Sequence, residues 1–179
     1  NLYIHKFQSR HTQKLWEIVL KKKGSLFRQC PKKFRSKKLF AVAAKQNPDI
    51  LRYSEFTEFH TDDLWIRALR INGSLIRQCP KDFLSPVLFA EAAKQNPDIL
   101  GYKGFTKFHT TELWRWSLEH NGFLILYVPA HLLTKDLFRR AVIQNPYVLT
   151  KERFRKFHTP ELWEIALSRY PEMGKYQKK

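Results

Sequence analysis

Apolar residues recur along this chain with the period of a helix, and the pattern itself returns at a fixed interval. Four tryptophans stand 49 residues apart, and three phenylalanines with the same spacing lie between them. These markers are Trp16, Trp65, Trp114 and Trp163, with Phe40, Phe89 and Phe138 between them. The apolar positions around each marker, such as Trp65, Ala68 and Leu69, fall on one helical face. A fixed period of this length indicates tandem structural repeats.

The start of each helix is marked by a hydroxyl side chain four residues before the marker. All seven markers have one: Thr12, Ser36, Thr61, Ser85, Thr110, Thr134 and Thr159. Ser or Thr at the N-cap accepts a hydrogen bond from an otherwise unpaired backbone N–H. We therefore expect a helix of about eleven residues after each hydroxyl. Glycine, as at Gly24, Gly73 and Gly122, or an Asn-Pro pair would end it, glycine by taking the left-handed conformation.

A second, shorter helix is expected after each of these ends, as over residues 73–79 and 97–102. A turn holding Phe34, Phe56, Phe83, Phe105, Leu132 or Phe154 would then close the half-unit. No half-unit of this size can bury its apolar face alone, so neighbouring half-units must stack. The sequence thus predicts an all-α, helical-repeat solenoid, with half-units of 24 and 25 residues in a 49-residue period. We expect about fourteen helices and no sheet.

The predicted array covers residues 1–179 as one domain. Leu2 and Phe7 already match Leu51 and Phe56 one period later, so the chain begins inside a repeat. We therefore expect a fragment of a longer chain, with a degenerate capping repeat as the alternative.

The half-units built on phenylalanine, called Phe-type here, share a further run of residues. It comprises Leu88, Ala92, Ala93, Lys94, Gln95 and Asn96 in one copy, and Leu39, Ala43, Ala44, Lys45, Gln46 and Asn47 in another. This run resembles a family of tandem short two-helix repeats of unknown function, associated with bacterial, viral and protist proteins. The resemblance implies a helical repeat fold and no particular activity. It does not extend to the Trp-type half-units, and Pro97 stands where glycine is expected in that family.

A histidine precedes the N-cap of every Trp-type helix, namely His11, His60, His109 and His158. We expect each imidazole to cover its tryptophan, as Leu84 and Leu133 would cover their phenylalanines in a hydrophobic staple. The alternative is a ladder of metal ligands. Successive copies would stand about 18 Å apart, whereas ligands of one ion lie within about 2 Å of it. We therefore predict no metal site and no cofactor.

The two cysteines are also one period apart, and Val128 takes their place in the third copy. A position that holds Cys30, Cys79 and then valine is interpreted as a small apolar packing site, with a redox or metal role as the alternative. Two cysteines do not form a disulfide framework, and we favour a reducing intracellular compartment.

The net charge of the chain indicates what kind of partner it binds. The chain carries 33 basic and 16 acidic residues, for a net charge of +17. Such an excess favours a polyanionic partner, either nucleic acid or an anionic membrane surface. No run of about 18 apolar residues suggests a membrane span. Hydrophobic residues make up 43% of the chain, which supports a packed core rather than disorder.

The basic excess is concentrated in the first period. Residues 1–49 carry a net charge of +11, whereas residues 50–98 carry −1, so the shared scaffold does not require this charge. The candidate nucleic-acid-binding residues are Lys21, Lys22, Lys23, Arg28, Lys32, Lys33, Arg35, Lys37 and Lys38. Lys37 and Lys38 open a helix, where the helix dipole disfavours cations. We expect the lysines and Arg35 to form one patch for an outside anion; a solvated, solubilising face is the alternative.

Some recurring polar and aromatic residues are also candidates for binding sites. Gln46, Gln95 and Gln144 precede each Asn-Pro pair, where a bond at the helix end is favoured over base reading because identical copies discriminate nothing. The marker aromatics are expected in the core rather than on a base-stacking platform. No metalloprotease, phosphate-loop, C-x-x-C or G-x-S-x-G motif is present, so we predict a protein that is not an enzyme.

The sequence therefore favours a non-enzymatic binding scaffold with a basic surface, most of all one that binds RNA. The alternative is a protein-interaction scaffold that takes an acidic protein partner, or a subunit of a larger assembly without nucleic-acid contact.

Overall fold

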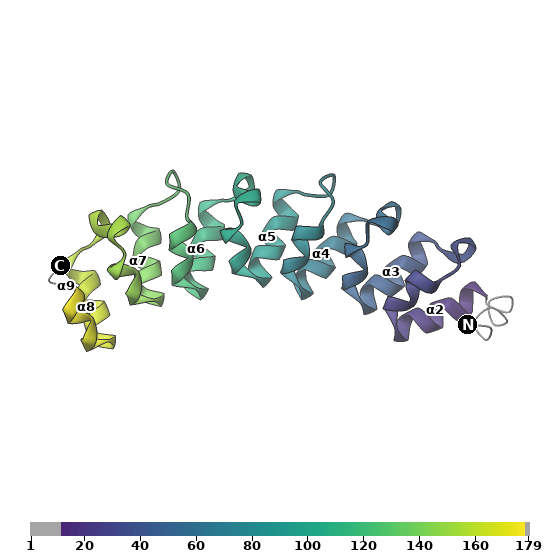
Figure 1. The fold of residues 1–179 in the computed structure, drawn as a ribbon, viewed down its shortest axis with the longest axis horizontal. Helices are drawn as coiled ribbons and strands as arrows, with labels where there is room; N and C mark the ends of the chain where they lie inside the picture. Colours follow the sequence, from purple (N-terminus) through teal and green to yellow (C-terminus); the bar gives the residue numbers. More distant parts are fainter. Residues whose placement is uncertain (1–11, 178–179) are drawn as a thin grey trace. The chain divides into compact units, whose positions relative to one another are not determined.

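The computed structural model describes residues 12–177, and this part of the chain is helical without a β-strand (Figure 1). The predicted all-α class is confirmed. None of its helices combines the length and the apolarity needed to cross a membrane. The chain divides into two compact units, Asn1–Gln95 and Asn96–Lys179, which are described separately. The repeat matches of Leu2, Phe7 and His11 lie outside the described residues.

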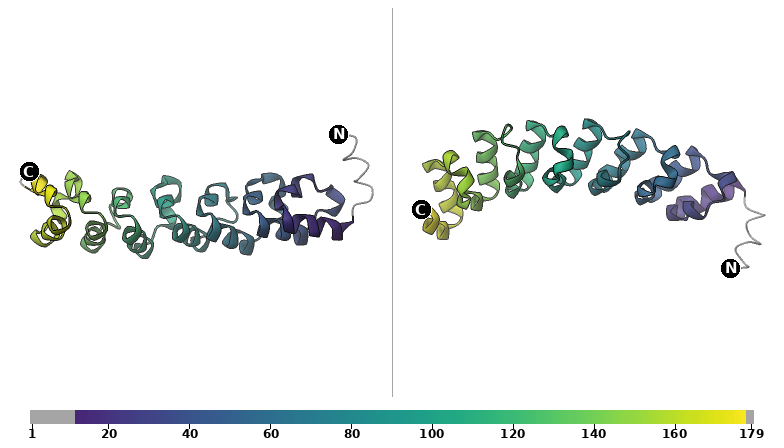
Figure 2. Two further views of the ribbon diagram at one scale, coloured as in Figure 1. Left: turned by 90° about the horizontal axis from the view of Figure 1, so that it is seen from below. Right: turned by 45° about the horizontal axis from the view of Figure 1, so that its top comes forward.

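From residue 12 onward, unit 1 contains four α-helices of ten residues, and each packs against the next along the chain. They are α2 (Gln13–Lys22), α3 (Lys37–Gln46), α4 (Asp62–Ile71) and α5 (Pro86–Gln95). The 3₁₀-helices between them are η1 (Gly24–Gln29), η2 (Lys32–Phe34), η3 (Pro48–Arg52), η4 (Ser54–Phe59) and η5 (Gly73–Gln78). The α-helices form one row and the 3₁₀-helices a second row beside it (Figure 2).

Unit 2 repeats this order of elements. Its α-helices are α6 (Thr111–His120), α7 (Lys135–Gln144), α8 (Pro160–Arg169) and the short α9 (Gly174–Gln177). Its 3₁₀-helices are η6 (Pro97–Gly101), η7 (Lys103–Phe108), η8 (Gly122–Tyr127), η9 (Pro146–Thr150), η10 (Glu152–Phe157) and η11 (Pro171–Met173). In the sequence, α6, η8 and α7 each begin 49 residues after α4, η5 and α5.

The short helices differ from the expectation. They are 3₁₀-helices, and each Phe-type half-unit contains two of them, so the expected turn around Phe56 is the helix η4. Residues 12–177 hold eight α-helices and eleven 3₁₀-helices, and the expected total of about fourteen was too low. Segments of three to six residues favour the tighter winding, because each hydrogen bond then closes after three residues instead of four.

The helix starts follow the prediction. All seven predicted N-cap hydroxyls accept a hydrogen bond from the backbone N–H three residues later, at 3.3 Å. The amide oxygens of Asn47, Asn96 and Asn145 cap the following 3₁₀-helices in a similar way, each accepting from the N–H two residues later. A cap of this kind stabilises a helix by about 1 kcal/mol.

The glycines after the Trp-type helices serve a purpose that the sequence did not reveal. No described glycine has a positive φ, so the expected left-handed helix ends are wrong. A Cβ at Gly24 would lie 2.1 Å from the carbonyl oxygen of Ala43, and one at Gly122 would lie 2.4 Å from that of Ala141. Glycine is required here because the backbone of the next helix approaches too closely for any side chain.

The marker aromatics form the core, and Trp65 and Trp114 are fully buried. The expected contact between histidine and tryptophan is confirmed for His60–Trp65, His109–Trp114 and His158–Trp163, with ring centroids 5.2 to 5.7 Å apart, and the rings meet edge to face. Burial lowers the pKa of His60 to about 4, so its imidazole is neutral at pH 7.

Candidate nucleic-acid interface

The nine predicted basic residues lie along α2, α3 and the segments between them, in unit 1. Two of them converge on one carboxylate: Lys21 Nζ lies 3.2 Å and Lys38 Nζ 3.6 Å from Glu17 oxygens. Lys21 is in the last turn of α2, and Lys38 is in the first turn of α3. The pKa of Glu17 is lowered, first by the hydrogen bond from Lys21 and then by the charge of Lys38. One anion thus faces two cations at this helix pair.

Lys45 extends this basic surface, although it was not among the predicted residues. With Lys21, Val42 and Gln46 it lines a hollow of about 450 Å³ on α2 and α3. It also borders a second hollow of about 320 Å³ between α3 and α4, whose lining includes Arg67 and Ile71. Both hollows combine cationic and apolar side chains, and Lys45 joins them.

Five further candidates are exposed lysines around the same two helices. Lys22 ends α2 and Lys23 caps it, Lys32 and Lys33 lie in η2, and Lys37 begins α3. No acidic side chain of the described residues forms an ion pair with any of them. The first turn of α3 contains no acidic residue, so the unfavourable placement of cations against its dipole, expected from the sequence, is present.

The two arginine candidates are engaged inside the molecule. Arg35 donates from Nε to the carbonyl of Cys30 at 2.8 Å and from Nη2 to that of Arg28 at 3.0 Å, and its guanidinium lies 5.2 Å from the Phe56 ring centroid. Arg28 pairs with Glu55 at 3.4 Å. These contacts lie among the 3₁₀-helices, so the candidates divide between the two rows of unit 1 instead of forming one set.

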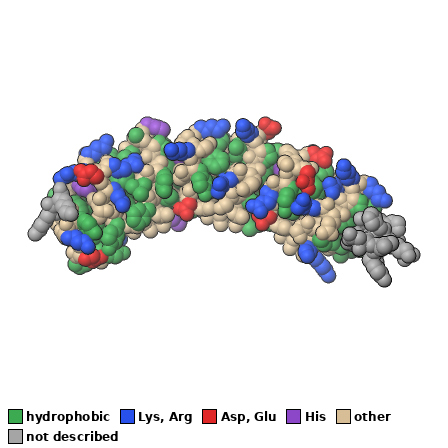
Figure 3. All heavy atoms as spheres, viewed as in Figure 1, with side chains coloured by type: hydrophobic (Ala, Val, Ile, Leu, Met, Phe, Trp, Pro, Cys, Tyr) green, Lys and Arg blue, Asp and Glu red, His purple; other side chains and the backbone are tan. Residues whose placement is uncertain are grey.

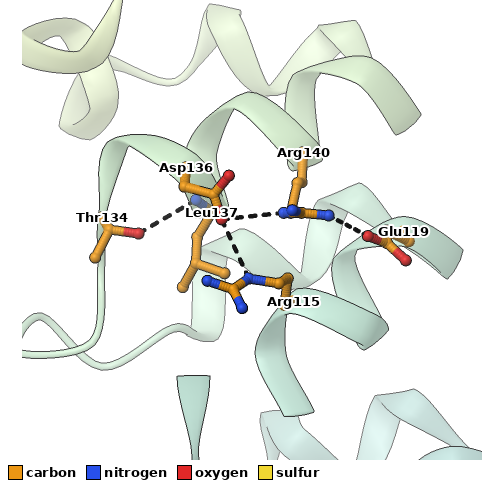
Figure 4. A network of polar contacts seen from close by, with 6 residues as sticks. All are labelled: Arg115, Glu119, Thr134, Asp136, Leu137 and Arg140. Carbon is orange, nitrogen blue, oxygen red and sulfur yellow. Dashed lines mark hydrogen bonds and ion pairs between the residues drawn. The ribbon is translucent and has the colours of Figure 1, made fainter. Parts of the chain in front are cut away.

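In two other helix pairs, α4–α5 and α6–α7, basic side chains pair with acidic ones across the helices. In unit 1, Arg70 on α4 bonds Glu91 on α5 at 2.6 Å. In unit 2, Arg115 on α6 and Arg140 on α7 flank Asp136, at 3.3 and 3.0 Å (Figure 4). Arg140 also reaches Glu119, so this network holds two cations and two anions. These two helix pairs therefore do not share the surplus of cations that surrounds Glu17 on α2 and α3.

The recurring glutamines hold neighbouring elements together. Gln46 Oε1 accepts from the N–H of Gly24 at 2.5 Å, and the same bond joins Gln95 to Gly73 and Gln144 to Gly122 at 2.6 Å. A bond at the helix end was expected, but the donor belongs to the end of the preceding Trp-type helix. With the amide oxygen occupied in this way, base reading by these glutamines is disfavoured.

The cysteines lie in the core as separate, free thiols. Burial raises the pKa of Cys30 to about 11 and that of Cys79 to about 12. Both thiols therefore stay protonated at neutral pH, which agrees with the packing interpretation. Within residues 12–177, no three His, Cys, Asp or Glu side chains are grouped so as to hold a metal ion.

On the face drawn in Figure 3, lysine and arginine side chains are interspersed with hydrophobic ones and do not form a separate block. Comparison with known proteins gives no match to a family model, to a curated protein or to a solved structure.

Proposed function

We propose that the protein is a non-enzymatic scaffold that binds RNA through the basic surface of α2 and α3. As part of this proposal the chain is a helical-repeat solenoid, with half-units of 24 and 25 residues in a 49-residue period. The observation that carries the proposal is the convergence of Lys21 and Lys38 on the single carboxylate of Glu17, with Lys45 lining a hollow together with Lys21. One carboxylate cannot neutralise two ammonium groups, so this cluster keeps a net positive charge. Exposed lysine ammonium groups are typical phosphate contacts, and they bind with little regard to sequence.

The shape of this surface favours a single strand over a duplex. Its two hollows, of about 450 and 320 Å³, mix apolar walls with cations and alternate with ridges of the helices. A flexible strand can place phosphates on the ridges and riboses or bases in the hollows, whereas a rigid duplex cannot enter them.

The test replaces three lysines of this surface, in the variant Lys21→Gln, Lys38→Gln, Lys45→Gln. We expect weaker binding to an unstructured RNA and a log–log salt slope smaller by about 0.7 for each phosphate contact removed. Stability should stay within about 0.5 kcal/mol, because the three side chains are exposed. Affinity would be measured by fluorescence anisotropy at salt concentrations from about 50 to about 200 mM, where phosphate contacts weaken steeply.

A variant with the same change of net charge provides the control. Lys151, Lys156 and Lys175 are exposed lysines of unit 2, and their replacement by glutamine should leave the slope nearly unchanged. Equal losses in both variants would show that only net charge matters. An unaltered slope in the α2–α3 variant would overturn the RNA proposal for this surface.

The alternative function, a protein-interaction scaffold, is favoured by a different observation. Leu15 and Ile18 on α2 are 42% and 50% exposed, whereas Leu64, the counterpart of Leu15 on α4, is 8% exposed. A hollow of about 140 Å³ beside them is lined by apolar side chains alone. An acidic protein partner or a neighbouring subunit of a larger assembly would cover this face, and salt-insensitive binding to RNA would favour that function.

A further inference from the structure

Unit 2 contains a hollow of about 380 Å³ between η6 and η8. Asp98, Gly101, Tyr102, Phe123, Leu124 and Tyr127 contribute to its lining. Its three aromatic side chains remain well exposed, Tyr102 and Phe123 at 39% and Tyr127 at 57%. Large exposed rings gathered around a concave surface of this volume are typical of a small binding site.

The repeats show that the scaffold does not need these residues. In unit 1, η3 and η5 pack against each other as η6 and η8 do in unit 2. Three lining positions differ between the two pairs: Gly101, Phe123 and Tyr127 replace Arg52, Ser74 and Gln78 of 49 residues earlier. Two exposed aromatics and one glycine are therefore additions to this copy, and packing of the core does not account for them.

Gly101 makes room for one of the rings. A Cβ at this position would lie 3.6 Å from the Tyr127 ring, so the ring rests against the glycine backbone. An arginine, as at position 52, would have to share the hollow with that ring. The glycine and the tyrosine thus fit together as a pair that unit 1 lacks.

The lining of the hollow also includes a carboxylate, that of Asp98, and the amide of Asn121. Asp98 Oδ1 accepts a hydrogen bond from Asn121 Nδ2 at 3.3 Å. In the described part of the chain Asp98 takes no part in an ion pair. The negative charge and the electron-rich ring faces both repel anions and attract cations. A metal ion is a poor match, because Ca²⁺ or Mg²⁺ requires about six oxygen ligands.

We propose that this hollow binds an alkylated ammonium group, namely the methylated lysine side chain of a partner protein. Ring faces attract such a cation without hydrogen bonds, and its methyl groups bury apolar surface against Leu124 and the rings. Asp98 supplies the compensating charge. The site is independent of the RNA-binding surface proposed for α2 and α3.

The first experiment separates charge from shape. The full chain is titrated by calorimetry with choline and with 3,3-dimethylbutan-1-ol, its uncharged carbon isostere. We expect choline to bind about tenfold more tightly. Equal binding of the two probes would reduce the hollow to a plain apolar cleft, and no binding of choline would overturn the proposal outright. Preferential binding of a free mononucleotide would overturn it in favour of base stacking.

The second experiment uses residues that the chain itself carries at the matching positions. Phe123→Ser and Tyr127→Gln should each weaken choline binding by about threefold to thirtyfold. Gly101→Arg should abolish it, because the arginine fills the hollow with its own cation. Tyr176→Gln, an exposed tyrosine outside the lining, is the control and should bind choline as the parent does. Unchanged affinity in all three site variants would contradict the assignment.

The third experiment builds the site in unit 1, where Asp49 and Tyr53 already match Asp98 and Tyr102. The triple variant Arg52→Gly, Ser74→Phe, Gln78→Tyr should bind two cholines per chain instead of one. A peptide with trimethyl-lysine, compared with its unmethylated form, tests the source of the cation. We expect a preference for the methylated peptide, and binding of choline without that preference would overturn the partner side chain as ligand.

Discussion

At the scale of single residues, the glycine after a Trp-type helix lies too close to a carbonyl of the next helix for a side chain to fit. In the variant Gly122→Ala the new methyl group would meet the carbonyl oxygen of Ala141 at 2.4 Å. We expect a loss of about 1–3 kcal/mol in the free energy of unfolding, because the backbone must shift. A methyl group at Gly104 would have no atom within 4 Å, and Gly104→Ala should be neutral or stabilising by up to about 1 kcal/mol. Urea unfolding of both variants compares them directly, and equal effects would contradict the close-approach explanation.

His60 makes stability depend on pH. It lies among the rings of Phe40, Trp65 and Phe83, and neither imidazole nitrogen forms a hydrogen bond. Its pKa falls from 6.5 in the unfolded chain to about 4 in the folded chain. Between these two pH values the unfolded chain binds a proton at His60 and the folded chain does not. The contribution of neutral His60 to the free energy of unfolding is complete above pH 6.5 and is lost as pH falls toward 4. From pH 7 to pH 5 this single group should cost about 2 kcal/mol.

The variant His60→Leu isolates this contribution, because leucine is the residue that Leu84 provides at the matching place before a Phe-type helix. Unfolding of parent and variant is followed at pH 7 and pH 5. The variant should lose less stability on acidification than the parent does. Burial also lowers the pKa of His109 and His158, so a smaller dependence of the same sign should remain. Identical pH dependence in the two proteins would refute the role of His60.

At the scale of elements, one glutamine joins the end of a Trp-type helix to the end of the Phe-type helix that follows it. Gln144 accepts from the N–H of Gly122 at 2.6 Å and donates to the carbonyl of His120 at 3.1 Å. Gln144→Met keeps the side-chain volume but leaves the buried N–H unpaired, at a cost of about 1–3 kcal/mol. Gln29→Met, at an exposed position of η1, is the control. Thermal unfolding should separate the two variants, and indistinguishable midpoints would show that the bond is dispensable.

The sequence predicted where elements begin better than how they end. A helix start depends on local chemistry, because the hydroxyl of Thr61 or Ser85 accepts a hydrogen bond from the backbone N–H only three residues later. The end at Gly24 depends on the carbonyl of Ala43, which comes close only after folding. The winding of the short helices was missed as well, since their length alone does not separate an α-turn from a 3₁₀-turn.

The same distinction holds for the candidate site. The charge pattern indicated Lys21 and Lys38 as candidates, but their shared contact with Glu17 appears only in the structure. The contacts of Arg35 could not be predicted from the sequence. The carbonyls of Arg28 and Cys30 accept hydrogen bonds from it only once the intervening segment is folded. Lys45 was overlooked because Lys94 stands at the same position one period later. It was therefore assigned to the run shared by the Phe-type half-units and not to the basic excess of the first period.

At the scale of the whole molecule, we expect each half-unit to depend on its neighbours for stability. Trp65 is fully buried in α4, which packs between α3 and α5 in unit 1. Trp65→Ala should lower the free energy of unfolding by about 3–5 kcal/mol and remove hydrogen-exchange protection from α3 and α5. Trp116, which is only half-buried, is the control, and Trp116→Ala should have a much smaller effect. An unchanged thermal midpoint for Trp65→Ala would place this tryptophan outside the core.

The charge pairs between adjacent helices have a consequence for assembly. Chains of similar repeats can exchange neighbours, within one molecule or between two, because each half-unit offers nearly the same apolar face. Here the same two positions of the helix pair carry different signs in different copies. If α2 paired with α7, Glu17 would face Asp136 and Lys21 would face Arg140, two repulsions in place of the native attractions of Asp136 to Arg115 and of Arg140 to Glu119. Ion pairs on an exposed surface add little to the free energy of unfolding. These pairs would instead contribute specificity, because they disfavour the packing of a helix against the wrong neighbour.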